Sequence, residues 1–260
     1  MHSFERGFLS EPFDEVRHQV RLNHQSWHAL LHEVNIIAVE LQYQITVHSG
    51  EPRELFGAVL FSRILSSSQA AVILLEHGLV AQARCVLRSA LEALFSLGAI
   101  ATKPKLVDRL IEAHKAEQQR AAKNITLWRH PDLKAIAAEQ LDSGKLAEFL
   151  IDESKSISAF ELAEAGGYED WYRSLYMTLS WSAHGAAIDL ERHMVKDDDD
   201  FLVEMQNEPD TQHQEVAWLV AIEIQIKAVF ELAEIFPSVD KLVFEQYESK
   251  LHALASALND

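Results

Sequence analysis

The sequence predicts an all-α protein, a multi-helix bundle centred on a long helical hairpin. Glycine (9) and proline (6) are scarce among 260 residues, which favours long helices over structures with many turns. Residues 79–101 read LVAQARCVLRSALEALFSLGAIA and are apolar on almost every side, as in a helix at the middle of a bundle. Residues 53–76 precede them, and His77-Gly78 is a helix-ending signal. The two helices should therefore lie antiparallel.

The first element of the bundle should be one long amphipathic helix from Pro12 to about Val47. Its apolar residues recur at steps of three and four, and Ser49-Gly50-Glu51-Pro52 ends it. Near 195–206, four aspartates lie between two short apolar runs, which indicates a small β-hairpin with an acidic turn. The other helices are expected at 105–130, 132–141, 145–152, 168–194, 211–235 and 239–257.

The chain is expected to form a single helical domain over residues 1–260, a length that can bury a large core. Within it, residues 1–50 hold the N-terminal helix, residues 53–235 the core bundle and residues 239–257 the C-terminal helix.

Composition indicates a cytoplasmic protein with no membrane partner. The formal net charge of -17 disfavours general binding to nucleic acids or anionic membranes. Cys85 is the only cysteine, so no disulfide can form within the chain and a reducing compartment is expected. We find neither a leader peptide nor an uninterrupted run of about 18 apolar residues, the length that a membrane span needs.

Three charged residues lie along the apolar segment 79–101. Arg84, Arg88 and Glu92 are spaced four apart, so they form one row on one face of a helix. They can satisfy one another as internal ties. Alternatively they form a cationic pocket for a phosphate or carboxylate, in which Glu92 orients Arg88.

A second row lies on segment 168–194. At the helical period, Arg173, Ser180, His184 and Glu191 fall on one narrow stripe that has apolar residues on both sides. The stripe is therefore expected to be buried, with His184 either a core histidine bound by a neighbour or part of a cleft shared with the first row.

Burial predicts how the two rows meet. A buried charge without a partner costs several kcal/mol, so the rows should face each other. Arg88, Glu92 and His184 should form one polar cluster inside the bundle, with Ser180 and Arg84 at its edges.

Two further patterns have ordinary alternatives. His24, His28 and His32 are spaced four apart, as in chelating helices, but no acidic residue completes a set, so we expect an exposed polar face and no metal or cofactor. Residues 103–134 carry eight basic residues against four acidic ones. This segment can hold RNA on a locally basic surface, or it is an ordinary solvated helix.

Two segments resemble a family of bacterial proteins called domain of unknown function 5677. They are ARCVLRSALEALF (83–95) and YRSLYMTLSWSAHG (172–185), within a resemblance that spans roughly residues 55–235. The resemblance implies a helical protein and says almost nothing about activity. The matching positions are Arg88, Glu92, Tyr172, Arg173, Ser180 and His184.

A looser resemblance links the chain to HEPN-type helical domains, many of which are dimeric, metal-independent ribonucleases. Their motif is an arginine followed at short distance by a histidine. The pairs with such a spacing here are Arg17–His24, Arg21–His28 and Arg109–His114.

Three functions remain open at this point. Whether the protein is an enzyme at all also remains open. The first is binding of a small anionic ligand or nucleotide at an internal Arg/Glu/His site. The second is a HEPN-like ribonuclease, and the third is a structural or partner-binding module with no small-molecule site.

Excess apolar residues on the first helix, Leu22, Trp27, Ile36 and Ile37, also predict a homodimer. The candidate ligand-binding residues are Arg84, Arg88, Glu92, Tyr172, Arg173, Ser180 and His184.

Overall fold

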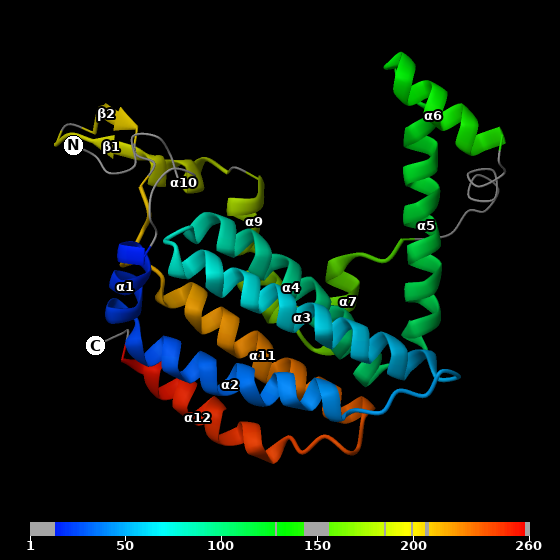
Figure 1. Cartoon of the computed structure of the whole chain (residues 1–260), viewed down its shortest axis with the longest axis horizontal. Helices are drawn as coiled ribbons and strands as arrows, with labels where there is room; N and C mark the ends of the chain where they lie inside the picture. Colours follow the sequence, from blue (N-terminus) through cyan, green and yellow to red (C-terminus); the bar gives the residue numbers. More distant parts are fainter. Residues whose placement is uncertain are drawn as a thin grey trace.

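The computed structural model describes residues 14–127, 129–142, 156–184, 186–198, 200–205 and 208–257. It confirms an all-α bundle with one small two-stranded sheet (Figure 1). The helix expected at 145–152 lies outside the described residues.

The central helical hairpin is confirmed as α3 (Pro52–Glu76) and α4 (Val80–Thr102). The turn depends on Gly78, whose φ of +72° suits glycine. A Cβ added there would lie 2.5 Å from the Cβ of Pro209. The turn is therefore packed against the loop that leads into α11.

A third long helix, α11 (Glu215–Ile235), packs against both arms of the hairpin, and α2 (Gln25–Gln44) and α12 (Leu242–Ser256) cover its other side (Figure 1). The ends of α4 and α11 are held by Arg53. Its guanidinium donates hydrogen bonds to the carbonyls of Ile100 (2.9 Å), Ala101 (2.7 Å) and Glu234 (3.1 Å). These carbonyls are among those that a helix end leaves without partners.

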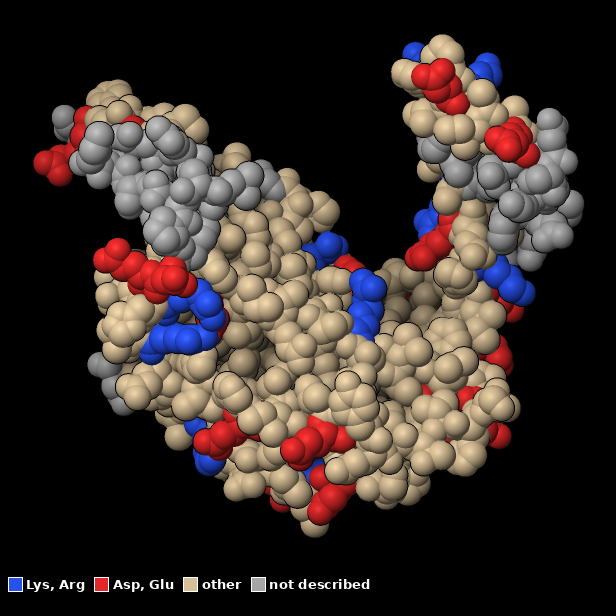
Figure 2. Space-filling view, viewed as in Figure 1, with Lys and Arg blue, Asp and Glu red and all other residues tan. Residues whose placement is uncertain are grey.

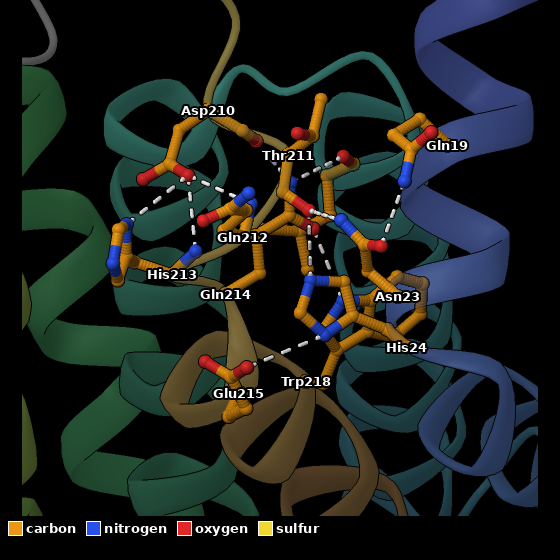
Figure 3. A network of polar contacts seen from close by, with 11 residues as sticks. Gln19, Asn23, His24, Asp210, Thr211, Gln212, His213, Gln214, Glu215 and Trp218 are labelled. Atoms are coloured by element: carbon orange, nitrogen blue, oxygen red, sulfur yellow. Dashed lines mark hydrogen bonds and ion pairs between the residues drawn. The ribbon is translucent and has the colours of Figure 1, made fainter.

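The prediction of one long N-terminal helix is wrong in one respect. The chain forms α1 (Asp14–Asn23) and then α2, with a break at His24. The side chains of Asn23 and His24 both reach the carbonyl of Thr211, at 2.8 Å and 3.2 Å (Figure 3). The break thus fits the chain around a loop that is distant in sequence.

The apolar face of this region is only partly open. Trp27 is buried and Ile37 packs against the core, whereas Leu22 and Ile36 are exposed. The homodimer expected through this face stays a prediction.

The continuous helix expected at 168–194 is also a misprediction. After α7 (Ala159–Gly166), the chain forms several short pieces. They are α8 (Glu169–Trp171), a π-helical turn η2 (Tyr172–Tyr176), α9 (Met177–His184), α10 (Ala187–Leu190) and the 3₁₀ turn η3 (Glu191–His193). A π-turn holds an extra residue, so side chains before it are rotated against those after it. The predicted stripe joining Arg173 to Ser180 is broken for this reason.

The β-hairpin is confirmed, with β1 (Met194–Lys196) antiparallel to β2 (Leu202–Met205). Two further helices, α5 (Leu106–Thr126) and α6 (Pro131–Asp142), form an arm that stands away from the bundle. Figure 2 shows the open space between this arm and the part of the bundle that carries α9.

By length and composition alone, two helices, α3 and α4, are long and apolar enough to cross a membrane. The search of the sequence for an uninterrupted apolar run did not predict this. Core helices of soluble proteins meet the same criteria. In the most apolar stretch of α4, 61% of the residues are buried inside the bundle.

Candidate functional site

Arg88 of α4 is the centre of a polar cluster at the contact between α4 and α9. Its Nε donates to Ser180 Oγ (3.0 Å), and its Nη2 donates to the Tyr176 hydroxyl (2.6 Å). Nη2 also lies 3.1 Å from Glu92 Oε1, which accepts a hydrogen bond of 2.7 Å from the Tyr176 hydroxyl. We call Arg88, Glu92, Tyr176 and Ser180 the Arg88 cluster.

One contact joins the two predicted rows, the hydrogen bond from Arg88 to Ser180. Glu92 meets Tyr176, and Arg88 meets both Tyr176 and Ser180, so the two helices run antiparallel.

The predicted location inside the bundle is wrong for the two charged residues of the cluster, because the side chains of Arg88 and Glu92 are partly exposed. The Arg88 side chain is 24% exposed and that of Glu92 is 41% exposed. His184 is exposed at the last turn of α9. Within the described ranges, no hydrogen bond or ion pair joins it to Arg88 or Glu92.

Tyr176 is a cluster member that the sequence reasoning missed. Burial raises the pKa of its phenol, and the hydrogen bond to Glu92 raises it further, so the hydroxyl keeps its proton and donates to the carboxylate. Its ring stacks on Tyr172, with centroids 4.8 Å apart, and the Arg88 guanidinium lies 4.8 Å from its centroid. The available signal was its position one turn before Ser180.

The remaining predicted residues have other surroundings. Tyr172 contacts the cluster through its ring, which stacks on that of Tyr176. Arg173 is exposed, donates two hydrogen bonds to Glu169 Oε1 (3.0 and 2.7 Å), and lies over the ring of Phe160. Arg84 is half-buried one turn before Arg88.

The prediction that His24, His28 and His32 lie on an exposed face of the first helix is also wrong, except for His32. His24 is 2% exposed; its Nδ1 lies 3.6 Å from Glu215, and its Nε2 faces the Thr211 carbonyl (Figure 3). His28 Nε2 lies 3.0 Å from Glu76 Oε1. Residues four apart advance by about 40° around a helix of 3.6 residues per turn, so His24 faces the bundle, His28 lies at its edge and His32 faces solvent.

Glu76 is a buried carboxylate at the end of α3, held by three side chains. Arg21 Nε donates to Oε1 (2.8 Å), Arg17 Nη2 donates to Oε2 (3.2 Å), and His28 contacts Oε1. Burial raises the pKa of Glu76, but the hydrogen bond and charge of Arg21, with His28 and Arg17, outweigh it and leave the pKa lowered. We call Glu76, Arg17, Arg21 and His28 the Glu76 cluster.

These contacts also bear on the metal and ribonuclease patterns. Among the described residues, no group of three or more His, Cys, Asp or Glu side chains is placed to hold a metal ion. In each Arg–His pair of HEPN-like spacing the arginine is engaged: Arg17 and Arg21 bind Glu76, and Arg109 lies 3.3 Å from Glu161.

Comparison with known proteins gives one match. Residues 55–201, more than half of the chain, match the model of a family described as a family of unknown function (DUF5677). The matched segment contains α4 and α9. No curated protein and no solved structure matches the chain.

Proposed function

Since the chain belongs to the family of unknown function DUF5677, we propose its function from the geometry of the site: the surface around Arg88 binds a small anionic ligand, a carboxylate or a phosphate. The observation that carries this proposal is the state of the Arg88 guanidinium. Nε and Nη2 are fixed by Ser180, Tyr176 and Glu92. Nη1 donates no hydrogen bond to any described residue. It is also not among the buried side-chain atoms that lack a hydrogen-bond partner.

A guanidinium fixed in this way is preorganised to bind an anion. Oxygen anions bind arginine through directed N–H donors, and a side chain that is already ordered loses less entropy on binding. The Ser180 hydroxyl donates to the Tyr176 carbonyl (2.6 Å) and accepts from Arg88, so it positions Arg88 and does not contact the ligand.

The charges beside Arg88 decide how the ligand is attracted. Glu92 neutralises Arg88 locally, so the attraction must come from neighbouring groups. Arg84 is one turn away on α4, and the exposed His184 is one turn beyond Ser180 on α9. The ligand would thus lie along the line from Arg88 to Arg84 and His184, away from Glu92.

The test is calorimetric titration with inorganic phosphate, a nucleoside monophosphate and a dicarboxylate. A hydrogen bond to a charged group contributes about 1.5–3 kcal/mol, so Arg88→Gln should weaken binding by about tenfold or more. Arg109→Gln, which removes an exposed arginine paired with Glu161, is the control and should bind like the wild type. Equal binding by Arg88→Gln, or no binding of any anion, contradicts the proposal.

One observation favours a second function, a metal-independent ribonuclease. His184 offers an exposed imidazole beside the Arg88 cluster, and such a reaction needs a histidine acid or base and an arginine to stabilise the phosphorane. RNA incubated with the protein in EDTA should then be cleaved by wild type and by His114→Ala, but not by His184→Ala. Absence of cleavage by the wild type excludes this function. If anions also fail to bind, the cluster is a structural tie between α4 and α9.

A further inference from the structure

Trp181 of α9 is an exposed tryptophan beside the Arg88 cluster, directly after Ser180 in the chain. Its exposed fraction is 41%, whereas Trp27 and Trp218 are 6% and 0% exposed. Of the four tryptophans in the described part of the chain, Trp181 alone is exposed. Ligand sites combine aromatic walls with a few placed polar groups, and an indole face next to an ordered guanidinium has both components.

Helix geometry places this ring on the open flank of α9. Counted from Ser180 around a helix of 3.6 residues per turn, Trp181 lies at about 100° and Met177 at about 60° in the same direction. Both side chains are exposed, that of Met177 at 46%. Leu179 lies at about 100° in the opposite direction and is buried. The surface of α9 is therefore open on the side of Ser180 that carries Trp181.

The contact between α4 and α9 is open on this same side. Because the two helices run antiparallel, residues turned in the same direction around each helix lie on the same side of their contact. On α4, Glu92 lies at about 40° from Arg88 in this direction, and its side chain is 41% exposed. Leu87 and Leu91 lie in the opposite direction and are fully buried. Arg88 and Trp181 thus border one stretch of accessible surface.

We propose, on the basis of the anion site proposed above, that the ligand is a nucleoside monophosphate whose phosphate binds Arg88 Nη1 and whose base stacks on Trp181. Inorganic phosphate or a dicarboxylate would leave the indole face in water. Stacking on an aromatic side chain tolerates any base, because every base has a π-face. We therefore expect little preference among the bases.

The charges around Arg88 favour a ligand with a single phosphate. Glu92 Oε1 lies 3.1 Å from Arg88 Nη2, so the guanidinium is already balanced locally. The whole chain carries a formal charge of -17, which repels a polyanion more strongly than a small ligand with one phosphate. A monophosphate is therefore favoured over a triphosphate and over RNA.

The π-helical turn η2, which directly precedes α9, supports a site at this place. Such turns often lie at functional sites. This one ends at Tyr176, whose hydroxyl accepts a hydrogen bond from Arg88 and donates one to Glu92. The guanidinium is therefore set before a ligand arrives, and the position of the phosphate relative to Trp181 is set with it.

Calorimetric titration of the full chain with adenosine monophosphate and with ribose 5-phosphate tests the proposal. The second compound keeps the sugar and the phosphate but lacks the base. The wild type should bind the nucleotide about fivefold or more tightly, as expected for stacking of a base on an aromatic ring. Trp181→Ala should remove this difference by weakening nucleotide binding to the level of ribose 5-phosphate. Tyr43→Ala removes an 83% exposed aromatic ring from α2 and, as the matched control, should keep the difference.

The outcomes separate this inference from the anion site itself. Equal affinity of the wild type for the two compounds, or a nucleotide advantage that persists in Trp181→Ala, overturns the role of Trp181 and leaves the anion site standing. Tighter binding of adenosine triphosphate than of the monophosphate overturns the assignment to a single phosphate. If none of these compounds binds, the proposed function fails and this inference fails with it. Circular dichroism of both variants verifies that they fold.

Discussion

Replacing Glu76 by glutamine tests whether the Glu76 cluster ties α1 and α2 to the central hairpin. Glutamine keeps the shape of the side chain and removes its charge. Arg17 and Arg21 then lose their counter-charge, and His28 loses the carboxylate at 3.0 Å.

The magnitude follows from burial. Removing one partner of a fully buried ion pair costs about 3–5 kcal/mol. The Glu76 side chain is 8% exposed, but those of Arg17 and Arg21 are 38% and 47% exposed, so both guanidiniums can recover some hydration. We therefore expect Glu76→Gln to lower the free energy of unfolding by about 2–3 kcal/mol at neutral pH.

The effect should also depend on pH, with a defined sign. The folded-state pKa of Glu76 is lowered from its ordinary value of 4.5. The ionised carboxylate therefore stabilises the folded protein at pH values above 4.5, and this contribution is lost as the pH falls through the lower folded-state pKa. The difference between wild type and Glu76→Gln should shrink in that acidic range.

Urea unfolding at neutral pH and at several acidic pH values measures both quantities. Glu33→Gln is the control, because it removes a carboxylate from the exposed ion pair with Lys250 and should have little effect. A loss in Glu76→Gln as small as in the control, or a loss that does not shrink in acid, would refute the reasoning.

Three further predictions follow from contacts elsewhere. Glu92→Ala should lower stability in urea unfolding by about 1 kcal/mol, because the half-exposed Arg88–Glu92 pair contributes less than the roughly 3–5 kcal/mol expected if it were buried; a loss in that higher range would contradict the observed exposure. Gly166→Ala should cost about 1–3 kcal/mol in thermal unfolding, since its Cβ would lie 2.9 Å from the Ala99 nitrogen, whereas Gly50→Ala enters open space and should be near neutral. Gln225→Met should stabilise the protein by about 1 kcal/mol, because neither polar atom of this fully buried amide has a partner among the described residues; a loss of stability would show that the amide is bonded.

Local sequence was enough for the features that depend on neighbours in the chain. The α3–α4 hairpin follows from two apolar segments and a glycine that allows the turn, and the acidic β-turn follows from aspartates that tolerate its backbone. The contact between Arg88 and Ser180 was also predictable, because a charged side chain flanked by apolar residues needs partners. Arg88 also donates to Tyr176, which the sequence reasoning missed.

Other features were decided by residues distant in sequence. His24 and His28 contact the carbonyl of Thr211 and the carboxylate of Glu76, although their spacing suits an exposed face. The π-turn at Tyr172–Tyr176 moves Arg173 out of line with Ser180, which a constant helical period cannot anticipate. The exposure of Glu92 depends on what covers α4. Periodicity specifies which side chains share a face, but only the packing of the other helices specifies whether that face meets protein or water.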